Sequence, residues 1–380
     1  MRKCVPVRNG KAFRDGLRAV QRNVFINGRF LEQRVTGVQR YARELLSALD
    51  FFVGPKSEYV LTLLTTCRAA ALPEFQNVRC RVVGRLSGQW WEQIELPRYV
   101  GDGLLVSLGN LGPLAMRRQI VTIHDASTAA LPANYSWLFR SWYNLALPVL
   151  CRRVKRVVTD SMFSKMEIGR YFSAKPANVR VVPLGLDHIR AKPADTNLLL
   201  EHSLKKNGYI LAVSSVSAHK NISALVEAMR CIPEPRLGLV LVGGINERIF
   251  AGVSVGAGLG VKQLGYVSDA QLRALYENAL CLVYPSFYEG FGLPPGEAMA
   301  CGCPVIVSDI PALREVCGDA ALYCNPADVA DIADKISRVV RDAALRESLA
   351  ARGEGRAAQF TWRFVAKFRE LNVRNRVLFQ

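Results

Sequence analysis

The strongest constraint on the fold is a repeated alternation of short apolar runs and longer amphipathic stretches. Short runs bounded by polar or glycine-containing segments are typical of strands, and most of the gaps between them show the period of a helix. The first six runs are residues 23–27, 59–64, 104–108, 120–123, 157–159 and 179–182. This alternation predicts βα units in a doubly wound, parallel, Rossmann-like domain.

A second series of the same kind follows a polar stretch at residues 191–207. Its strand-like runs are 209–214, 237–242, 281–284 and 304–307, with helices expected at 222–229, 269–279 and 295–300. A chain of 380 residues is long enough for two domains with separate cores. We predict a basic extension at 1–22, an N-terminal domain at 23–195, a linker at 196–208, a C-terminal domain at 209–358, and a C-terminal helix at 359–380 that packs back on the N-terminal domain.

The composition argues against several other classes of protein. Half of the residues are apolar and 22% are charged, as in a globular protein. The longest apolar stretch, residues 138–151, is interrupted by Arg140, so we expect no membrane-spanning helix. The first residues lack the apolar core of a secretory signal, which favours a cytoplasmic protein. The close pair Cys301 and Cys303 lacks the second pair that a zinc site requires.

The formal net charge of +18 predicts a polyanionic partner. Basic residues are dense in 2–22 and 152–156, and the second group follows the aromatic residues Trp137, Phe139 and Trp142. Aromatic and basic residues mixed in this way suit a lipid headgroup region. We therefore expect peripheral association with an anionic membrane surface, at the inner face of the plasma membrane. The dispersed charges and the lack of a recognisable module argue against nucleic acid.

Two glutamates flank a glycine-bearing turn in the segment 285–297, PSFYEGFGLPPGE. Glu289 is expected at a strand end and Glu297 in the first turn of a helix. Gly290 and Gly292 let the backbone approach a ligand, and the free amides of a helix start favour a diphosphate. We predict that Glu289 reaches a transferred sugar and Glu297 a ribose. Considered alone, Glu297 is better explained as a helix N-terminal charge, worth up to about 1 kcal/mol.

The Glu-x7-Glu spacing resembles that of the retaining glycosyltransferases of family 4, and the resemblance extends from Asn23 over nearly the whole chain. It implies an α/β protein of the GT-B fold, in which two Rossmann-like domains face each other across a deep cleft. It also implies that Phe291 and Leu293, with the adjacent glycines, hold the donor. The segment 212–228 is similar to the phosphate-binding strand and helix of that family, which makes Lys220 the phosphate-binding residue.

Other segments complete the resemblance. Many members of the family carry an arginine where this chain has Ser214 or Ser215, so we place these serines in the donor site and expect one cation fewer there. The segment 265–269 resembles the part of the family that receives the nucleobase, which implies contacts from Tyr266 and Val267.

Two further segments belong to the first domain. The loop 34–41 resembles a glycine loop over the cleft, so Gly37 is expected near the donor phosphate. His124 lies at a predicted strand end, where parallel sheets bind ligands, and resembles the family's histidine near the donor sugar. His124, Lys220 and Glu289 are therefore our candidate catalytic residues. Leu184 stands where the family usually has asparagine, so we assign no acceptor role there.

The resemblance implies transfer of a hexose from a nucleotide-diphosphate sugar, with retained anomeric configuration, to a lipid-linked or polysaccharide acceptor in cell-surface glycan synthesis. Similarity to bacterial mannosyl and rhamnosyl transferases favours GDP-mannose or a GDP-deoxyhexose as the donor. The sequence contains no Asp-x-Asp motif, so we expect neither an essential metal nor another cofactor.

Two alternatives compete with this interpretation. A nicotinamide-dependent oxidoreductase needs Gly-x-Gly-x-x-Gly between the first strand and helix, and the sequence lacks it there. A catalytically silent nucleotide-sugar-binding or scaffold protein of the same fold stays open. The joint presence of Lys220, Glu289 and Glu297 favours the enzyme.

Overall fold

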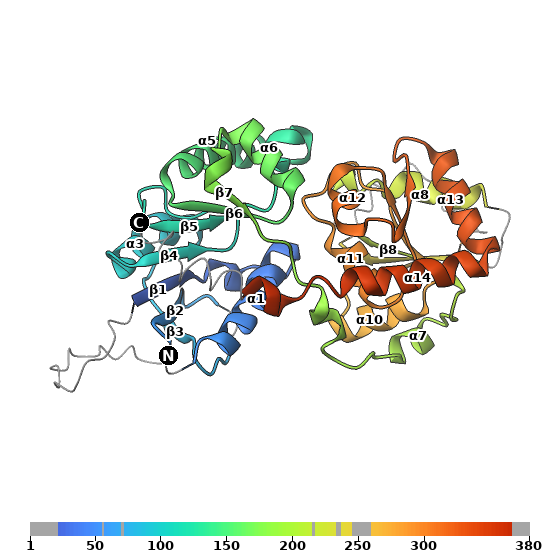
Figure 1. Cartoon of the computed structure of the whole chain (residues 1–380), viewed down its shortest axis with the longest axis horizontal. Helices are drawn as coiled ribbons and strands as arrows, with labels where there is room; N and C mark the ends of the chain where they lie inside the picture. Colours follow the sequence, from blue (N-terminus) through green and yellow to red (C-terminus); the bar gives the residue numbers. More distant parts are fainter. Residues whose placement is uncertain are drawn as a thin grey trace.

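The structure is a computed structural model that describes residues 22–54, 57–69, 72–214, 217–232, 237–244 and 260–366. It contains two parallel sheets that lie side by side, each covered by helices (Figure 1). The first has the strand order β3-β2-β1-β4-β5-β6-β7 and the second the order β10-β9-β8-β11-β12-β13. In both orders the chain winds outwards in two directions from a central strand. Two doubly wound, Rossmann-like domains were predicted, and the sheets confirm them.

The seven strands of the first sheet are β1 (Arg22–Asn27), β2 (Tyr59–Thr65), β3 (Arg79–Val82), β4 (Leu104–Ser107), β5 (Gln119–Thr122), β6 (Arg156–Thr159) and β7 (Val179–Val181). The sequence predicted all of them except β3. That strand lies at the edge of the sheet, and its residues RCRV are largely exposed. An edge strand has one paired side only and needs no apolar run, so its sequence carried no strand signal.

The longest helices of the first domain are α1 (Gly37–Phe52), α5 (Trp137–Arg153) and α6 (Met162–Phe172). α1 begins in a capping box formed by Thr36 and Gln39, and it buries Tyr41 and Leu45 in the core. Shorter elements are η1 (Arg29–Glu32), α2 (Gly88–Trp90), η2 (Trp91–Glu95), α3 (Leu96–Val100), α4 (Ser127–Ala130), η3 (Pro132–Asn134) and η4 (Pro176–Asn178).

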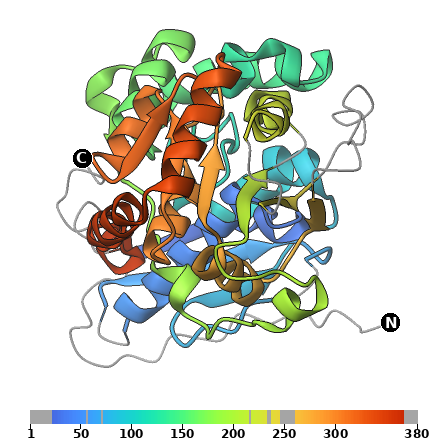
Figure 2. The same ribbon diagram turned by 90° about the vertical axis from the view of Figure 1, so that its right-hand side faces the viewer.

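The second sheet consists of β8 (Tyr209–Ser214), β9 (Gly238–Gly243), β10 (Val261–Gly265), β11 (Cys281–Tyr284), β12 (Val305–Ser308) and β13 (Ala321–Cys324). Its helices are η6 (Ala218–Lys220), α8 (Ile222–Arg230), α10 (Asp269–Asn278), α11 (Leu293–Ala300), α12 (Pro311–Cys317), α13 (Val329–Arg341) and α14 (Ala343–Ala357). Figure 2 views this domain with the first domain behind it. The strands β10 and β13, at the two edges, escaped the sequence analysis.

The chain passes from the first sheet to the second earlier than the predicted linker. η5 (Asp187–Arg190) already lies against the second domain, where Arg190 donates to the carbonyl of Ala300 and Asp195 N to that of Ala270. The predicted linker at 196–208 contains the helix α7 (Asn197–Glu201), because Leu198 and Leu199 are buried. The composition of this stretch is polar, but two leucines are enough to fix one helical turn on the domain.

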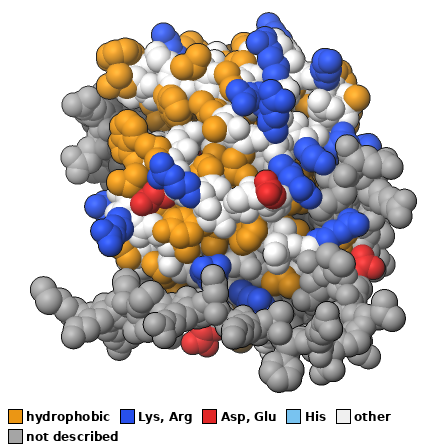
Figure 3. All heavy atoms as spheres, turned by 90° about the vertical axis from the view of Figure 1, so that its left-hand side faces the viewer, with side chains coloured by type: hydrophobic (Ala, Val, Ile, Leu, Met, Phe, Trp, Pro, Cys, Tyr) orange, Lys and Arg blue, Asp and Glu red, His pale blue; other side chains and the backbone are white. Residues whose placement is uncertain are grey.

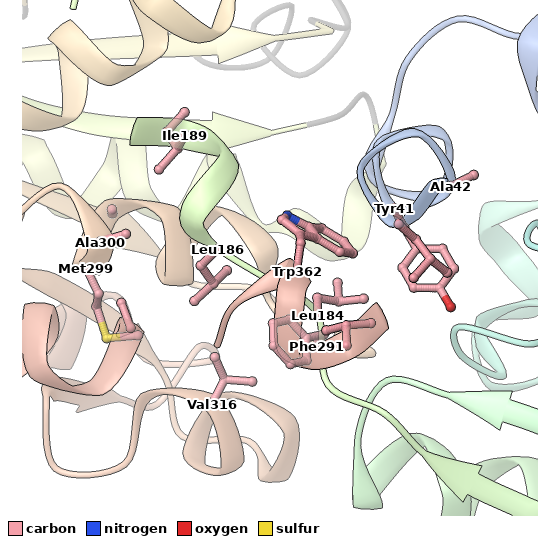
Figure 4. Packing of buried hydrophobic residues seen from close by; sticks show 14 of the residues in the cluster. Tyr41, Ala42, Leu184, Leu186, Ile189, Phe291, Met299, Ala300, Val316 and Trp362 are labelled. Carbon is pink, nitrogen blue, oxygen red and sulfur yellow. The ribbon is translucent and has the colours of Figure 1, made fainter. Parts of the chain in front are cut away.

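The C-terminal segment returns to the first domain. Trp362 is buried, and its ring lies 6.0 Å from that of Tyr41 in α1 (Figure 4). The C-terminal segment is held against the chain that crosses between the domains, because the Leu186 amide donates to the carbonyl of Phe360 at 2.9 Å. Gly185 has no space for a side chain, since a Cβ atom there would lie 2.4 Å from the backbone nitrogen of Trp362. Residues 367–380 of the expected C-terminal helix, and residues 1–21 of the basic extension, lie outside the described residues.

Candidate active site

A cavity of about 620 Å³ lies between the two domains, at the carboxyl edges of both sheets. Its volume is within the range of small-molecule sites, and its position is the one where open α/β sheets bind ligands. The predicted residues that line it are Gly37, His124, Ser214, Lys220, Tyr266, Val267, Glu289, Gly290, Phe291, Gly292, Leu293 and Glu297. Ser215 lies outside the described residues. The structure thus brings together segments that are up to 260 residues apart in the chain.

Lys220 and Glu289 form an ion pair in this cavity. Lys220 Nζ donates to Glu289 Oε1 at 2.6 Å and to the hydroxyl of Tyr284 at 2.7 Å. Burial disfavours the charged form of Lys220, but Glu289 and Tyr284 outweigh burial, so the pKa of Lys220 is raised. The lysine is therefore a fixed cation at neutral pH. A fixed cation beside an acidic side chain can meet both the diphosphate and a hydroxyl of a nucleotide sugar.

The local backbone explains why asparagine follows Lys220. η6 ends at Lys220, and Asn221 adopts the left-handed conformation with φ 57° before α8 begins. Asparagine and glycine tolerate this conformation better than other residues. Asn221 also donates from its side chain to the carbonyl of Pro326 at 2.7 Å. The Lys-Asn pair thus turns the chain sharply and directs Lys220 towards Glu289.

Glu297 is held by two partners that the sequence analysis did not identify. His188 Nε2 lies 2.8 Å from Glu297 Oε1, and the Tyr276 hydroxyl donates to Oε2 at 3.1 Å. Trp362 Nε1 donates to Nδ1 of His188 at 3.1 Å. Because an indole N–H can only donate, Nδ1 is the acceptor and the proton of His188 is on Nε2. His188 is thus a neutral donor to Glu297, and its tautomer is set by Trp362.

His124 forms a buried pair with Asp160. Nδ1 of His124 lies 2.6 Å from Asp160 Oδ2, and Nε2 lies 3.2 Å from the carbonyl oxygen of Leu108. Burial disfavours the imidazolium, but Asp160 outweighs burial and raises the pKa of His124. Burial raises the pKa of Asp160 as well. Both ring nitrogens face acceptors, so the pair retains one proton more than a neutral histidine beside an ionised aspartate.

This geometry changes what His124 can contribute. The imidazole nitrogens are already used by Asp160 and Leu108, so the ring presents no free nitrogen to the cavity. Its ring lies 4.7 Å from that of Tyr41, at nearly a right angle. The histidine lines the cavity as predicted, with a position fixed by three neighbouring residues.

The turn after Glu289 requires its glycines. A Cβ atom on Gly290 would lie 2.9 Å from the carbonyl oxygen of His124, in the other domain. Gly292, with φ 98°, precedes α11 in the left-handed region. Pro294 and Pro295 have no amide hydrogen, so the start of α11 offers fewer free donors than the sequence analysis assumed. Of its first three residues, only Leu293 carries an N–H group.

Several contacts join the two domains around the cavity. The guanidinium of Arg40 forms a two-point ion pair with Asp269, in which Arg40 Nη1 donates to Asp269 Oδ2 at 2.9 Å. The guanidinium of Arg34 lies 3.5 Å from the centre of the Tyr266 ring and covers one of its faces. A nucleobase that stacks on Tyr266 therefore has the opposite face available, or else displaces Arg34.

On the other side of the cavity, Glu315 of α12 accepts hydrogen bonds from the amides of Met162 and Phe163, at the start of α6. Ser161 and Ser164 donate to the carbonyl of Gly290 at 2.6 and 3.1 Å. The carboxylate of Glu315 satisfies free helix amides across the domain boundary, which places it among the contacts that join the two domains.

The described residues include no group of three or more His, Cys, Asp or Glu side chains arranged to hold a metal ion. Nine cysteines in this part of the chain are free, and most of them are buried. Independence from metals and cofactors stays a prediction.

Two Rossmann-like domains that face each other across a cavity with paired Lys and Glu side chains define a class of transferase with the GT-B architecture. Residues 201–356 match the family model of the glycosyl transferases group 1. The chain is 35% identical over 260 residues to the O-antigen chain mannosyltransferase B of Escherichia coli, covering 66% of this chain and 68% of that protein. The chain therefore belongs to the group 1 glycosyl transferases and is a glycosyltransferase.

Two further comparisons extend over more of the chain. The MMP alpha-(1->4)-mannosyltransferase of Mycolicibacterium hassiacum is 29% identical over 334 residues, 82% of this chain and 77% of that protein. The sucrose-phosphate synthase of Thermosynechococcus elongatus superposes with a TM-score of 0.74 at 21% identity, over 93% of this chain and 98% of that one. This structural similarity confirms the predicted GT-B fold for nearly the entire chain.

Proposed function

We propose that this glycosyltransferase moves a hexose from a nucleotide-diphosphate sugar, with retention of configuration, to a lipid-linked or polysaccharide acceptor in cell-surface glycan synthesis. The observation that carries the proposal is the Lys220–Glu289 pair, which lies in the cavity between the domains together with Glu297. The similarity to an O-antigen chain mannosyltransferase supports mannose as the transferred sugar. The sequence resemblance to bacterial mannosyl and rhamnosyl transferases makes a GDP-linked donor the first choice.

Different residues of the cavity bind different parts of the sugar donor. Lys220 neutralises charge on the diphosphate, and this stabilisation grows as the sugar–phosphate bond breaks. Glu289 accepts a hydrogen bond from a hydroxyl of the transferred sugar, while Glu297 accepts one from a hydroxyl of the ribose. Gly37, whose added Cβ would meet no atom within 4 Å, leaves space for the phosphates beside α1. The ring of His124, held by Asp160, bounds the sugar on the side of the first domain.

Retention follows from attack on the same face that the leaving group occupies. In this mechanism the departing phosphate oxygen takes the proton of the acceptor hydroxyl while the new glycosidic bond forms. The protein then contributes position and charge, and needs no nucleophile beneath the anomeric carbon. Metal independence is part of the proposal, because Lys220 supplies the positive charge that a bound cation would otherwise provide.

We further propose that the protein works at the inner face of the plasma membrane as a peripheral protein. None of the described helices is long and apolar enough to cross a bilayer. The surplus of basic residues supports attraction to anionic lipids.

The proposal is tested by a donor screen with GDP-, UDP-, ADP- and dTDP-sugars, in the presence and absence of EDTA, using membrane lipid extract as the acceptor source. We expect GDP-mannose or a GDP-deoxyhexose to give product with retained configuration, assigned by NMR, and EDTA to leave the rate unchanged. Lys220→Met should lower kcat by about 100-fold or more, as loss of one charge-stabilising donor does. Lys335→Met, on the surface of α13, is the matched control. Turnover of no nucleotide sugar, or a Lys220→Met rate equal to that of the control, would refute the proposal.

A further inference from the structure

The helix α5 carries an exposed apolar stripe along its outer side. Leu138 and Leu145 are 63% and 64% exposed, and Trp137 beside them is 70% exposed. At 100° per residue, Leu138 and Leu145 lie opposite the buried Leu147, which faces the sheet. An amphipathic helix of a globular domain normally turns a polar side to solvent, so this stripe marks a surface with a partner.

The neighbouring helix α6 repeats the pattern. Met162 and Met166, four residues apart, are 52% and 60% exposed, while Ile168 faces the core. α5 and α6 pack side by side on the same face of the first sheet (Figure 1). Both helices follow a strand of a parallel sheet, so both begin at its carboxyl edge, where the cavity lies. Their exposed apolar side chains therefore lie near the rim of the cleft.

The far ends of the same two helices are basic. Arg152 and Arg153 end α5, Arg170 lies near the end of α6, and Lys175 follows it, and all four are exposed. α5 contains no acidic residue. Among the described residues, Arg152, Arg153 and Lys175 take part in no ion pair, and Arg170 has a long contact of 3.7 Å with Glu167. Figure 3 shows hydrophobic and Lys/Arg side chains gathered on this domain, seen from the side away from the second domain, with few acidic side chains.

We propose that these nine residues, which we call the α5–α6 face, form the docking surface for an anionic phospholipid bilayer. The face consists of Trp137, Leu138, Leu145, Met162, Met166, Arg152, Arg153, Arg170 and Lys175. The apolar side chains enter the interfacial region, and the cations bind lipid phosphates. Trp and Met suit this position because one is amphipathic and the other is flexible. This inference rests on the proposed function in one respect, since a lipid-linked acceptor gives the docking its purpose.

The orientation of the face supports this occupant. Met162 lies two residues after Asp160, which lines the cavity, and the N-cap of α6, Ser161, contacts Gly290 in the turn after Glu289. A bilayer against the apolar part of the face would therefore lie beside the mouth of the cleft. An acceptor anchored in that bilayer could then reach the cavity with its headgroup, without leaving the membrane.

The test is vesicle flotation of the full chain. Vesicles of phosphatidylcholine alone are compared with vesicles of phosphatidylcholine and phosphatidylglycerol in equal parts. The wild type should float with the anionic vesicles, and added salt should weaken the binding. L138S/L145S removes the stripe, and R152E/R153E reverses two cations. Each should reduce the vesicle-bound fraction by about ten-fold or more, given that one basic residue changes partition by several-fold.

The controls have the same chemistry in the second domain. Leu200→Ser changes a leucine of α7 that is 78% exposed, and R338E/R341E reverses two exposed cations of α13. Both should float like the wild type, and all variants should keep the wild-type unfolding temperature. Equal flotation of face and control variants, or binding of neutral and anionic vesicles alike, would overturn the proposal. So would a wild type that binds a soluble polyanion such as heparin through Arg152 and Arg153 but floats with no vesicle.

The proposed reaction and the docking can fail separately. A wild type that turns over a lipid-linked acceptor in detergent but does not float refutes the docking alone. A wild type that floats through the α5–α6 face but turns over no nucleotide sugar supports the docking and refutes the proposed reaction. If both hold, the face variants should lose rate on vesicle-embedded acceptor and keep it on the same acceptor in detergent.

Discussion

Trp362 donates its indole N–H to Nδ1 of His188 at 3.1 Å, and this bond fixes His188 as a neutral donor to Glu297. The chain thereby connects its C-terminal segment, which packs on the first domain, to a carboxylate of the donor cavity in the second. His188 itself belongs to η5, on the segment that crosses between the domains. The three residues come from three different parts of the chain and meet where the domains join.

His188→Ala should therefore weaken donor binding more than it slows turnover. The carboxylate of Glu297 would lose the hydrogen bond from His188, and a hydrogen bond to a charged group is worth about 1.5–3 kcal/mol. Glu297 would then hold the ribose less firmly. We expect KM for the donor to rise by about ten-fold or more, with a smaller change in kcat. Steady-state kinetics with the donor varied gives both values.

Two variants sharpen this test. His188→Gln can accept from Trp362 and donate to Glu297, so it should recover part of the affinity. His202→Ala, a half-buried histidine outside the cavity, should leave KM unchanged. A fall in kcat with an unchanged KM would show that His188 does not act through the ribose carboxylate.

The Lys220–Glu289 pair should be strongly coupled in stability as well. Both side chains are largely buried, so removal of one leaves the other charge unpaired. Lys220→Met or Glu289→Gln alone should cost about 3 kcal/mol, because breaking a buried pair is expensive. The double variant should cost clearly less than the sum, since no unpaired charge remains. Urea unfolding of the four proteins gives the coupling free energy.

A more exposed ion pair provides the control for this cycle. Lys335 and Asp331 are one turn apart on α13, with Nζ and Oδ1 2.8 Å apart. Their coupling should be about 0.5 kcal/mol, as for other partly exposed helix pairs. If the losses in unfolding free energy of the Lys220 and Glu289 single variants add up to the loss of the double variant, each charge has an alternative partner in the cavity.

The proton shared by His124 and Asp160 predicts a pH dependence of stability. In the unfolded chain His124 loses its proton near its ordinary pKa of 6.5, whereas the folded pair keeps the proton to higher pH because the pKa of His124 is raised. Above about pH 6.5 the folded state thus binds more protons, and stability falls as pH rises. For this pair the free energy of unfolding falls by up to about 1.4 kcal/mol per pH unit, until the folded pair loses its proton.

Asp160→Asn removes the charge that raises the pKa of His124. We expect urea unfolding of the variant to depend much less on pH above about 6.5. At lower pH the stability lost by the variant should be larger than at high pH, because the contribution of the pair is complete only below the unfolded pKa. Parallel pH profiles for the two proteins would contradict the protonation state that we assign.

Sequence reasoning reached most of this fold because the central strands of a parallel sheet are apolar throughout. β8, β11 and β12 form such runs and were predicted, whereas the edge strands β3 and β10 contain polar residues and were not. Edge position is a property of the assembled sheet, so no local signal marks it. The crossing at η5 was missed for a similar reason, because only the packing against α10 and α11 shows where the chain changes domain.

The site divides in the same way. Lys220, Glu289 and Glu297 lie in segments whose spacing is distinctive, so the sequence indicated them. Their partners follow from three-dimensional proximity, and His188 is 109 residues from Glu297. Asp160 lies 36 residues from His124, at the end of the adjacent strand. Neighbouring strand ends in a parallel sheet gave the one signal that could have identified this pair from the sequence.

A close contact between the two domains at Gly290 tests their arrangement directly. Gly290, which follows Glu289, lies against His124 and Asp125, and an added Cβ would lie 2.9 Å from the His124 carbonyl oxygen and 3.0 Å from the Asp125 Cβ. The carbonyl oxygen of His124 is a backbone atom two residues after the end of β5, so it can move aside only if the chain moves with it. Gly290→Ala should therefore separate the domains or strain the turn, at a cost of about 1–3 kcal/mol, and should lower activity because Glu289 is the preceding residue.

Gly355→Ala is the matched substitution. Gly355 lies on the exposed side of α14, where an added Cβ would meet no atom within 4 Å. Alanine there should raise stability by up to about 1 kcal/mol, because glycine is a poor helix former. Calorimetry of both variants, with small-angle scattering to follow the separation of the domains, gives the comparison. If Gly290→Ala keeps the wild-type scattering profile, unfolding temperature and activity, the arrangement of the two domains does not depend on this contact.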